Sequence, residues 1–234
     1  MWKNLFLSFV MFLCLLVLLW LAQTLFSVPN LLKWRDAAWC VGLPASIIGV
    51  AYVLTIRNPL NYTGFYPGIL MSLLLSVQFF LQTNYDLTLL YLCVFIPFQA
   101  RSIIQWKRHQ PCTDEAKPQF LSTRMMLLTV FVFMLLFCAD WLLVSFMNCG
   151  NVDQDCLIDG WLLKLLGGLM IASSVMANFW LIYRKNDAWI YWIIYSLAGI
   201  GFYVVVGNIF SIVLFVFFLI VNSVAAKSWI FPSV

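Results

Sequence analysis

The stretch YRKNDAWIYWIIYSLAGIGFYVVVGNIFSIVLFVFFLIVNSVAAKSW, from Tyr183 to Trp229, decides the fold of this chain. After a basic corner at Arg184 and Lys185, residues 188–207 carry no charge. A short polar break at Gly207-Asn208 follows, and a second uncharged run continues to Ala226. At a rise of about 1.5 Å per residue, each run is long enough to cross the roughly 30 Å hydrocarbon core of a bilayer. The stretch therefore predicts a transmembrane helical hairpin.

The composition of the whole chain agrees with this interpretation. The sequence is 64% hydrophobic and 9% charged, whereas about 25% of the residues of a soluble domain are charged. We therefore predict an all-α integral membrane protein, in which the short connections leave no room for a soluble catalytic domain. Windows of about 19 residues predict eight transmembrane helices, at residues 5–27, 38–56, 63–82, 87–106, 124–147, 160–183, 187–206 and 208–226.

The C-terminal hairpin has a counterpart in the first half of the chain. Gln99 precedes Trp106 by the same seven residues that separate Asn222 from Trp229, and a lysine lies close to each tryptophan. A further apolar helix is predicted before each hairpin, at 38–56 and 160–183. The pattern favours an internal repeat, with a chance match as the alternative.

Lysine and arginine indicate the orientation in the membrane, because short cytoplasmic loops are rich in both. With eight spans the two termini share one face of the membrane. That face collects nine basic residues, Lys3, Arg57, Lys107, Arg108, Lys117, Arg124, Arg184, Lys185 and Lys227, against Lys33 and Arg35 on the other. We therefore predict that both termini are cytoplasmic.

The sequence carries no signature of an enzyme. It has no G-x-x-x-x-G-K-[ST] phosphate loop and no G-x-S-x-G turn, and its single histidine, His109, lies in a loop. We expect no catalytic residue, no cofactor, no metal site and no nucleic-acid partner. A transporter, a channel, or a structural or assembly subunit remains. Cys149 and Cys156 bracket one outer loop and form either a disulfide or two free thiols.

Neutral polar side chains inside the spans are the better candidates for a binding site. Gln78, Gln99, Asn178 and Asn222 each offer a carboxamide at membrane depth. Such a group has two possible roles: it contacts a ligand, or it forms an interhelical hydrogen bond worth about 0.6 kcal/mol.

Aromatic side chains accompany these carboxamides. Trp189, Trp192 and Ser196 are spaced as i, i+3 and i+7, which places them on one helical face beside Tyr195. Flat aromatic faces beside carboxamides suit a planar ring with an amide or a sugar, and a cationic ring would add cation–π attraction. An aromatic stripe also occurs in ordinary packing. Tryptophans near span ends are expected in an interfacial belt: Trp34, Trp39, Trp106, Trp161 and Trp229.

Three charged residues lie within predicted spans. Arg101 is close enough to the cytoplasmic end of its helix to snorkel to the interface. Asp140 and Lys164 lie at similar depth on consecutive helices, so we predict an ion pair between them. Proton coupling through Asp140 is the alternative.

Taken together, these motifs resemble the PnuC family of vitamin transporters. The resemblance rests on Arg184-Lys185 followed by W-x-x-W at Trp189 and Trp192, on the closing Asn222 and Trp229, and on Q-x6-W at Gln99 in the first half. It covers about residues 38–230. Ala188, Ser196 and Gln99 stand where family members often have asparagine, which leaves the exact substrate open.

The resemblance implies a core of two parallel three-helix repeats joined by one linker helix, as in SWEET-like folds. On this basis residues 1–37 form an extra N-terminal helix, 38–106 the first repeat, 107–158 the cytoplasmic loop, linker helix and outer loop, and 159–234 the second repeat. It also implies a homotrimer in the bacterial cytoplasmic (inner) membrane.

The function implied by the resemblance is facilitated diffusion of nicotinamide riboside, a vitamin B3 precursor, into the cell, where phosphorylation traps it. Thiamine, riboflavin or a deoxynucleoside is the alternative substrate, and a non-transporting scaffold subunit the alternative function. The motif match gives Trp189, Trp192 and Asn222 as ligand contacts. The polar and aromatic pattern adds Gln78, Gln99, Asn178, Trp180 and Tyr195.

Overall fold

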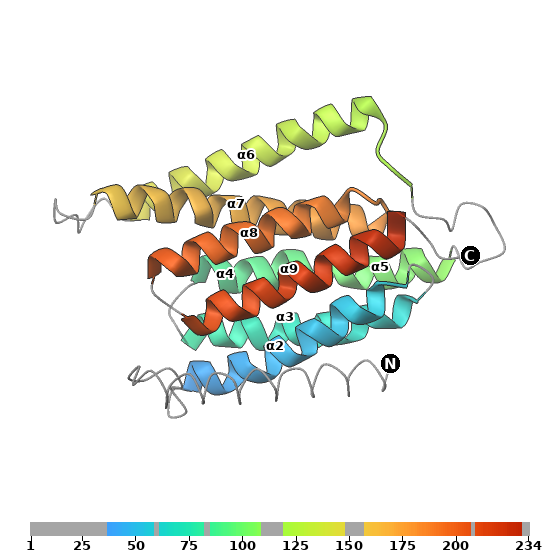
Figure 1. Ribbon diagram of the computed structural model, residues 1–234, viewed down its shortest axis with the longest axis horizontal. Helices are drawn as coiled ribbons and strands as arrows, with labels where there is room; N and C mark the ends of the chain where they lie inside the picture. The colour runs from blue at the N-terminus through green and yellow to red at the C-terminus, as the bar shows by residue number, and fades with distance from the viewer. Residues whose placement is uncertain are drawn as a thin grey trace. The chain divides into compact units, whose positions relative to one another are not determined.

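The computed structural model describes residues 37–58, 61–81, 85–108, 119–147, 157–206 and 209–230 (Figure 1). The chain divides into two compact units. Unit 1 comprises Met1–Pro118, Ile182–Arg184 and Lys227–Val234, and unit 2 comprises Gln119–Leu181 and Lys185–Ala226. The predicted N-terminal helix at 5–27 lies outside the described residues, as do Cys149 and Cys156.

The described residues are almost entirely helical. The first half contains α2 (Ala37–Ile56), a 3-10 turn η1 (Tyr62–Gly64), α3 (Phe65–Leu81), α4 (Tyr85–Leu90), a π-helical turn η2 (Tyr91–Phe95) and α5 (Ile96–Arg108). The second half contains α6 (Thr123–Met147), α7 (Leu157–Ile182), α8 (Ala188–Val206) and α9 (Ile209–Ile230).

Hydropathy identifies these helices as membrane spans. Among the described residues, 6 helices are long and apolar enough to cross a bilayer, and Pro44–Ile56 of α2 forms a shorter apolar helix. The prediction of an all-α, multi-pass membrane protein is thereby confirmed. Some helix ends differ from the prediction: the helix predicted to begin at residue 160 begins at Leu157, and the last helix, predicted to end at residue 226, continues to Ile230. A hydropathy window ends at the charged Lys227. The helix itself continues, because a basic residue in the last turn of a helix is favourable.

The helix that carries Gln99 contains an irregular turn. Ile96 N–H bonds to the carbonyl of Tyr91, five residues back, which marks the π-helical turn η2. Pro97 follows directly and has no N–H to donate. Such π turns in helices are frequent at functional sites, and this one lies one helical turn before Gln99.

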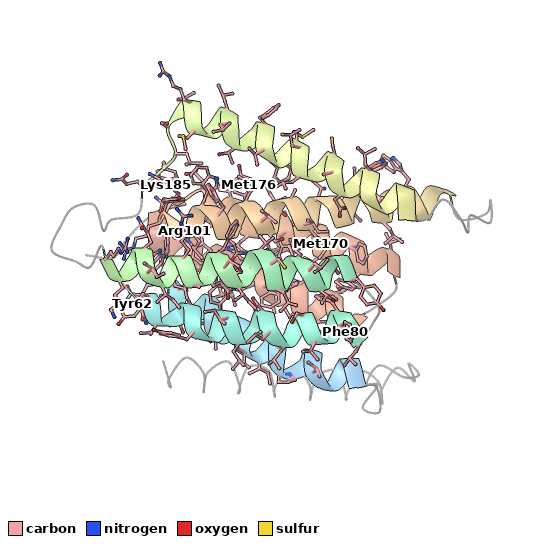
Figure 2. All side chains as sticks on the ribbon, turned by 180° about the vertical axis from the view of Figure 1, so that it is seen from behind. Tyr62, Phe80, Arg101, Met170, Met176 and Lys185 are labelled. Carbon is pink, nitrogen blue, oxygen red and sulfur yellow. The ribbon has the colours of Figure 1, made fainter. Side chains whose placement is uncertain are left out.

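In unit 1, α3 packs between α2 and α5, and Figure 2 labels Tyr62 in the turn η1 that precedes α3 and Phe80 near the end of α3. The buried residues of α3 are Phe65, Gly68, Ser72 and Ser76, which repeat at the spacing of one helical face. Beyond Phe65 this face consists of small residues, two of them serine, unlike the bulky apolar face of a soluble core helix. It therefore brings neighbouring polar side chains close to the backbone of α3.

Trp106 is the centre of a buried aromatic knot in unit 1. Its ring lies 4.8 Å from Phe65 and 5.8 Å from Trp229, measured between centroids. The Trp229 Nε1–H donates to the carbonyl of Arg57 at 2.8 Å. Trp106 is 0% and Trp229 2% exposed, so their assignment to an interfacial belt is wrong. Trp161 is exposed, as expected of a belt residue.

Arg184 joins the same knot from the turn between α7 and α8. Its Nη2 donates to the carbonyl of Trp106 at 3.0 Å, and its Cζ lies 4.8 Å from the centre of the Trp106 ring. Burial lowers the pKa of Arg184 from its ordinary value. Its φ is 52°, in the left-handed region that non-glycine residues rarely adopt. The hydrogen bond and the cation–π contact offset that backbone strain.

In unit 2, the segment before α6 is hydrogen-bonded to the turn between α7 and α8. Asn186 N–H bonds to the carbonyl of Gln119 at 2.9 Å, and Leu121 N–H bonds to Asp187 Oδ2 at 2.8 Å. Helix α6 itself is exposed along most of its length, with 6% of its apolar window buried. It contacts α7 where the Phe137 ring lies against Gly168.

The knot yields a prediction for stability. Trp229→Phe keeps an aromatic ring beside Trp106 but removes the hydrogen bond to Arg57, so we expect a loss of about 1 kcal/mol. The measurement is the apparent melting temperature in detergent, followed by size-exclusion chromatography. The control is Trp161→Phe, which alters an exposed ring and should leave the melting temperature unchanged. Equal effects of the two substitutions would contradict a stabilising role for the hydrogen bond from Trp229 to Arg57.

Candidate functional site

Unit 2 contains a cluster of polar and aromatic side chains, which we call the Asn222 cluster: the buried Trp192 and Ser196 and the half-buried Tyr195 on α8, and the buried Asn222 on α9. Asn222 Nδ2 donates to Ser196 Oγ at 3.0 Å and to the carbonyl of Trp192 at 3.4 Å. Ser196 is 0% and Asn222 2% exposed. The cluster thus links the two helices of the hairpin at membrane depth.

The orientation of the Asn222 carboxamide follows from these bonds. The Trp192 carbonyl accepts from Ser196 Oγ at 2.9 Å and can itself donate nothing. The amide group of Asn222 that faces it must therefore be the NH₂. Asn222 Oδ1 then points elsewhere, and it has no hydrogen-bond partner among the described residues. The same holds for the indole Nε1–H of Trp192.

A buried acceptor and a buried donor without partners are unusual. Most buried polar groups are hydrogen-bonded, and an exception calls for an explanation such as a water or a ligand. The pair Asn222 Oδ1 and Trp192 Nε1–H can accept one hydrogen bond and donate another. This combination is the complement of a primary carboxamide, which offers an N–H and a C=O.

Aromatic rings build one wall of the Asn222 cluster. Trp192 and Tyr195 meet edge to face, with centroids 5.5 Å apart, and Tyr195 lies 5.3 Å from Phe215 on α9. Phe215 can approach this closely because it lies over Gly199, where a Cβ atom would overlap its ring. The close approach of α8 and α9 thus depends on a glycine.

Unit 1 contains a smaller counterpart, the Gln99 cluster, made of Ser72 on α3 and Gln99 on α5. Gln99 Nε2 donates to Ser72 Oγ at 3.2 Å, and Gln99 is 1% exposed. Ser72 and Gln99 are 27 residues apart, and Ser196 and Asn222 are 26 residues apart. The same serine–carboxamide bond thus occurs in both halves of the chain, and the internal repeat stays a prediction.

The remaining candidates lie as follows. Gln78 is directed at α2, where its Cδ lies 2.7 Å from the position of a Cβ on Gly42. Asn178 Nδ2 donates to the Ser174 carbonyl of its own helix at 2.9 Å. Trp180 contacts Phe179 at 5.0 Å between centroids, and Trp189 is fully buried. Of the eight candidates, Trp192, Tyr195 and Asn222 are thus joined in one described cluster.

Two partners of the carboxamides, Ser72 and Ser196, are missing from the set of ligand contacts predicted from the sequence. A signal for both exists, because each serine lies seven residues after a large aromatic residue, Phe65 or Trp189. Serine in a transmembrane helix is common, however, and its spacing alone does not reveal which helix it faces.

The intramembrane charges are consistent with structural roles. Arg101 is exposed, and its Nη2 reaches Tyr183 Oη at 3.5 Å, as expected of a snorkelling side chain. Asp140 is buried, and its Oδ2 lies 3.4 Å from the position of a Cβ on Gly168. Lys164 precedes Gly168 by one helical turn, so it lies on the same face of α7. The Asp140–Lys164 ion pair stays a prediction.

Among the described residues, no group of three or more His, Cys, Asp or Glu side chains could hold a metal ion. The Asn222 cluster and the Gln99 cluster contain only neutral side chains. Their chemistry is that of binding by hydrogen bonds and ring contacts.

Comparisons with known proteins agree with this description. Residues 39–231 match the family model described as nicotinamide mononucleotide transporter. The crystal structure of the vitamin B3 transporter PnuC has a similar fold, with a TM-score of 0.60 and 16% sequence identity over 98% of this chain and 95% of that chain. The chain has no significant match among curated proteins.

The contact of Phe215 with Gly199 gives a prediction for this site. Gly199→Ala adds a methyl group that overlaps the Phe215 ring, and such overpacking costs about 1–3 kcal/mol. We expect a lower melting temperature in detergent. Gly167→Ala on α7 is the control, because its Cβ would meet only Phe202, at 3.9 Å. If Gly199→Ala were as stable as Gly167→Ala, the packing of Phe215 on Gly199 would be refuted.

Proposed function

Because the chain belongs to the nicotinamide mononucleotide transporter family, we propose that it is a permease that carries nicotinamide riboside, a vitamin B3 precursor, into the cell. The family and the similar crystal structure are transporters, not enzymes. The proposal names the riboside because it combines a carboxamide, a cationic ring and a sugar in one small molecule.

The observation that carries the proposal is the pair of unpartnered groups in the Asn222 cluster. The carboxamide of nicotinamide donates an N–H to Asn222 Oδ1 and accepts the Trp192 Nε1–H. Each hydrogen bond satisfies a buried group that no other described residue satisfies. Ser196 fixes the direction of Asn222 and therefore positions the acceptor.

The aromatic wall suits the rest of the nicotinamide group. The pyridinium ring of the riboside is flat and positively charged, and tryptophan and tyrosine faces attract cations through their ring quadrupole. Tyr195 extends the wall and is held in place by Phe215. We propose Trp189, Asn178, Trp180, Gln78 and Gln99 as further contacts along the solute's path.

Transport proceeds by facilitated diffusion in this proposal. The Asn222 cluster is neutral, so it provides no proton-binding group to couple uptake to a pH difference. Net uptake then requires a reaction in the cytoplasm that removes the product, and phosphorylation of the riboside provides one. A phosphate group would add charge that a neutral, apolar path disfavours.

The proposed arrangement in the membrane follows the charge pattern and the repeat. The excess of lysine and arginine supports cytoplasmic termini in a bacterial inner membrane. The two serine–carboxamide pairs support two parallel three-helix repeats, α2 to α5 and α7 to α9, with α6 as the linker and one further N-terminal helix. Resemblance to the family supports a homotrimer.

Loss of the Trp192 side chain tests the site. Trp192→Ala removes the indole donor and the ring contact, so we expect the dissociation constant for nicotinamide riboside to rise at least tenfold, which corresponds to about 1.4 kcal/mol. Isothermal titration calorimetry on purified protein measures it. Trp161→Ala removes an exposed tryptophan and should bind like the parent. Unchanged affinity for Trp192→Ala would show that this face only packs.

A transport assay tests the energetics. In liposomes containing the purified protein, radiolabelled nicotinamide riboside should equilibrate across the membrane and stop at equal concentrations. An imposed pH difference should leave that end point unchanged, because the Asn222 cluster contains no carboxyl, imidazole or amine group. Accumulation of unmodified riboside above the external concentration would overturn facilitated diffusion.

A further inference from the structure

The two proposed repeats differ on the helical face that carries the serine, where one position has glycine in the first repeat and tryptophan in the second. Superposing the serine–carboxamide pairs places Ser72 on Ser196, so Phe65 corresponds to Trp189 and Gly68 to Trp192. In both helices the three positions follow the i, i+3, i+7 spacing of a single face. The first repeat therefore has glycine where the second has the tryptophan that donates an indole N–H.

Tyr52 of α2 lies over this glycine. A Cβ at Gly68 would lie 2.8 Å from Tyr52 Cδ2, 2.9 Å from Tyr52 Cε2 and 3.1 Å from Gln99 Cδ. The absence of a side chain at Gly68 is thus what allows the Tyr52 ring and the Gln99 carboxamide to approach the same point. The aromatic residue of the first repeat comes from α2, whereas in the second repeat it comes from α8.

The hydroxyl of Tyr52 is buried without a hydrogen-bond partner in the described part of the chain. Tyr52 is 1% exposed, and its Oη is among the buried polar atoms that lack a partner. The neighbouring Ser72 and Gln99 bond to each other. A tyrosine hydroxyl offers one donor and one acceptor on the same atom. It therefore matches a single alcohol better than it matches a carboxamide, which needs its donor and acceptor on separate atoms.

We propose that the Tyr52 hydroxyl hydrogen-bonds a hydroxyl group of the transported solute, which makes Tyr52 a specificity-determining residue of the first repeat. This inference rests on the proposed function and adds the sugar to the groups that the protein recognises. The ligand class is a pentose-bearing molecule rather than a free pyridine base.

Tyr52→Phe tests the inference, because it removes one oxygen atom and keeps the ring over Gly68. The probes are nicotinamide riboside and its analogues that lack the 2′- or the 3′-hydroxyl, titrated by calorimetry. The parent should bind one of the deoxy analogues about tenfold more weakly than the riboside. Tyr52→Phe should bind the riboside about tenfold more weakly than the parent does and should no longer distinguish it from that analogue.

Stability without ligand separates this role from a structural one. If the hydroxyl awaits a solute, Tyr52→Phe should melt at the same or a higher temperature than the ligand-free parent, since it removes an unsatisfied buried group. Tyr66→Phe, which alters an exposed tyrosine of α3, is the matched control and should change neither binding nor stability.

The outcomes are distinguishable. A parent that binds no nicotinamide riboside overturns the proposed function and this inference with it. A parent that binds the riboside, together with a Tyr52→Phe variant of equal affinity and equal discrimination, overturns only the role of Tyr52. A lower melting temperature with unchanged affinity would assign the hydroxyl to an internal hydrogen bond.

Discussion

A hydrogen-bonding group within the hydrocarbon core of a membrane cannot turn to water, so it must find a partner in the protein or in what the protein binds. Most of the described polar side chains obey this constraint locally: Ser46, Thr55, Ser102, Thr129 and Ser223 each donate to the carbonyl four residues back. Asn222 Oδ1 and Trp192 Nε1 have no hydrogen-bond partner among the residues that the structure describes. These two exceptions are therefore the observation on which the proposed binding site rests.

The same side-chain hydrogen bond occurs in both halves of the chain, beside different neighbours. A serine on one helix and a carboxamide on another are bonded in each half, by Ser72 and Gln99 and by Ser196 and Asn222. Beside the second pair stands a tryptophan, and beside the first a glycine covered by Tyr52. The tryptophans near the ends of α5 and α9, Trp106 and Trp229, pack on each other. The Trp106 carbonyl accepts a hydrogen bond from the Arg184 guanidinium, and the Trp229 indole donates one to the Arg57 carbonyl. The same serine–carboxamide bond therefore occurs beside two unlike side chains.

Hydropathy predicted the membrane helices well, because the length of an uncharged run is nearly all that the bilayer requires of them. The seven-residue spacing to a tryptophan also located both carboxamides that pair with serine. What periodicity does not give is the rotation of a helix against its neighbours. For this reason the sequence places Trp106 and Trp229 at the interface although they are buried. For the same reason it does not show that Gln99 bonds to a serine, whereas Gln78 lies against Gly42. The left-handed turn at Arg184 is accompanied by tertiary contacts with Trp106 that no local sequence pattern records.

The central claim is that Asn222 and Trp192 recognise a carboxamide, and the most direct test compares two ligands that differ only there. Calorimetric titration of the unaltered protein with nicotinamide riboside and with nicotinic acid riboside at neutral pH isolates this group. The ionised acid has acceptors but no N–H, so Asn222 Oδ1 would stay unpaired and face a negative charge, at a cost of about 1–3 kcal/mol. The account predicts that the acid binds roughly 10-fold to 100-fold more weakly. Equal or tighter binding of the acid would contradict it.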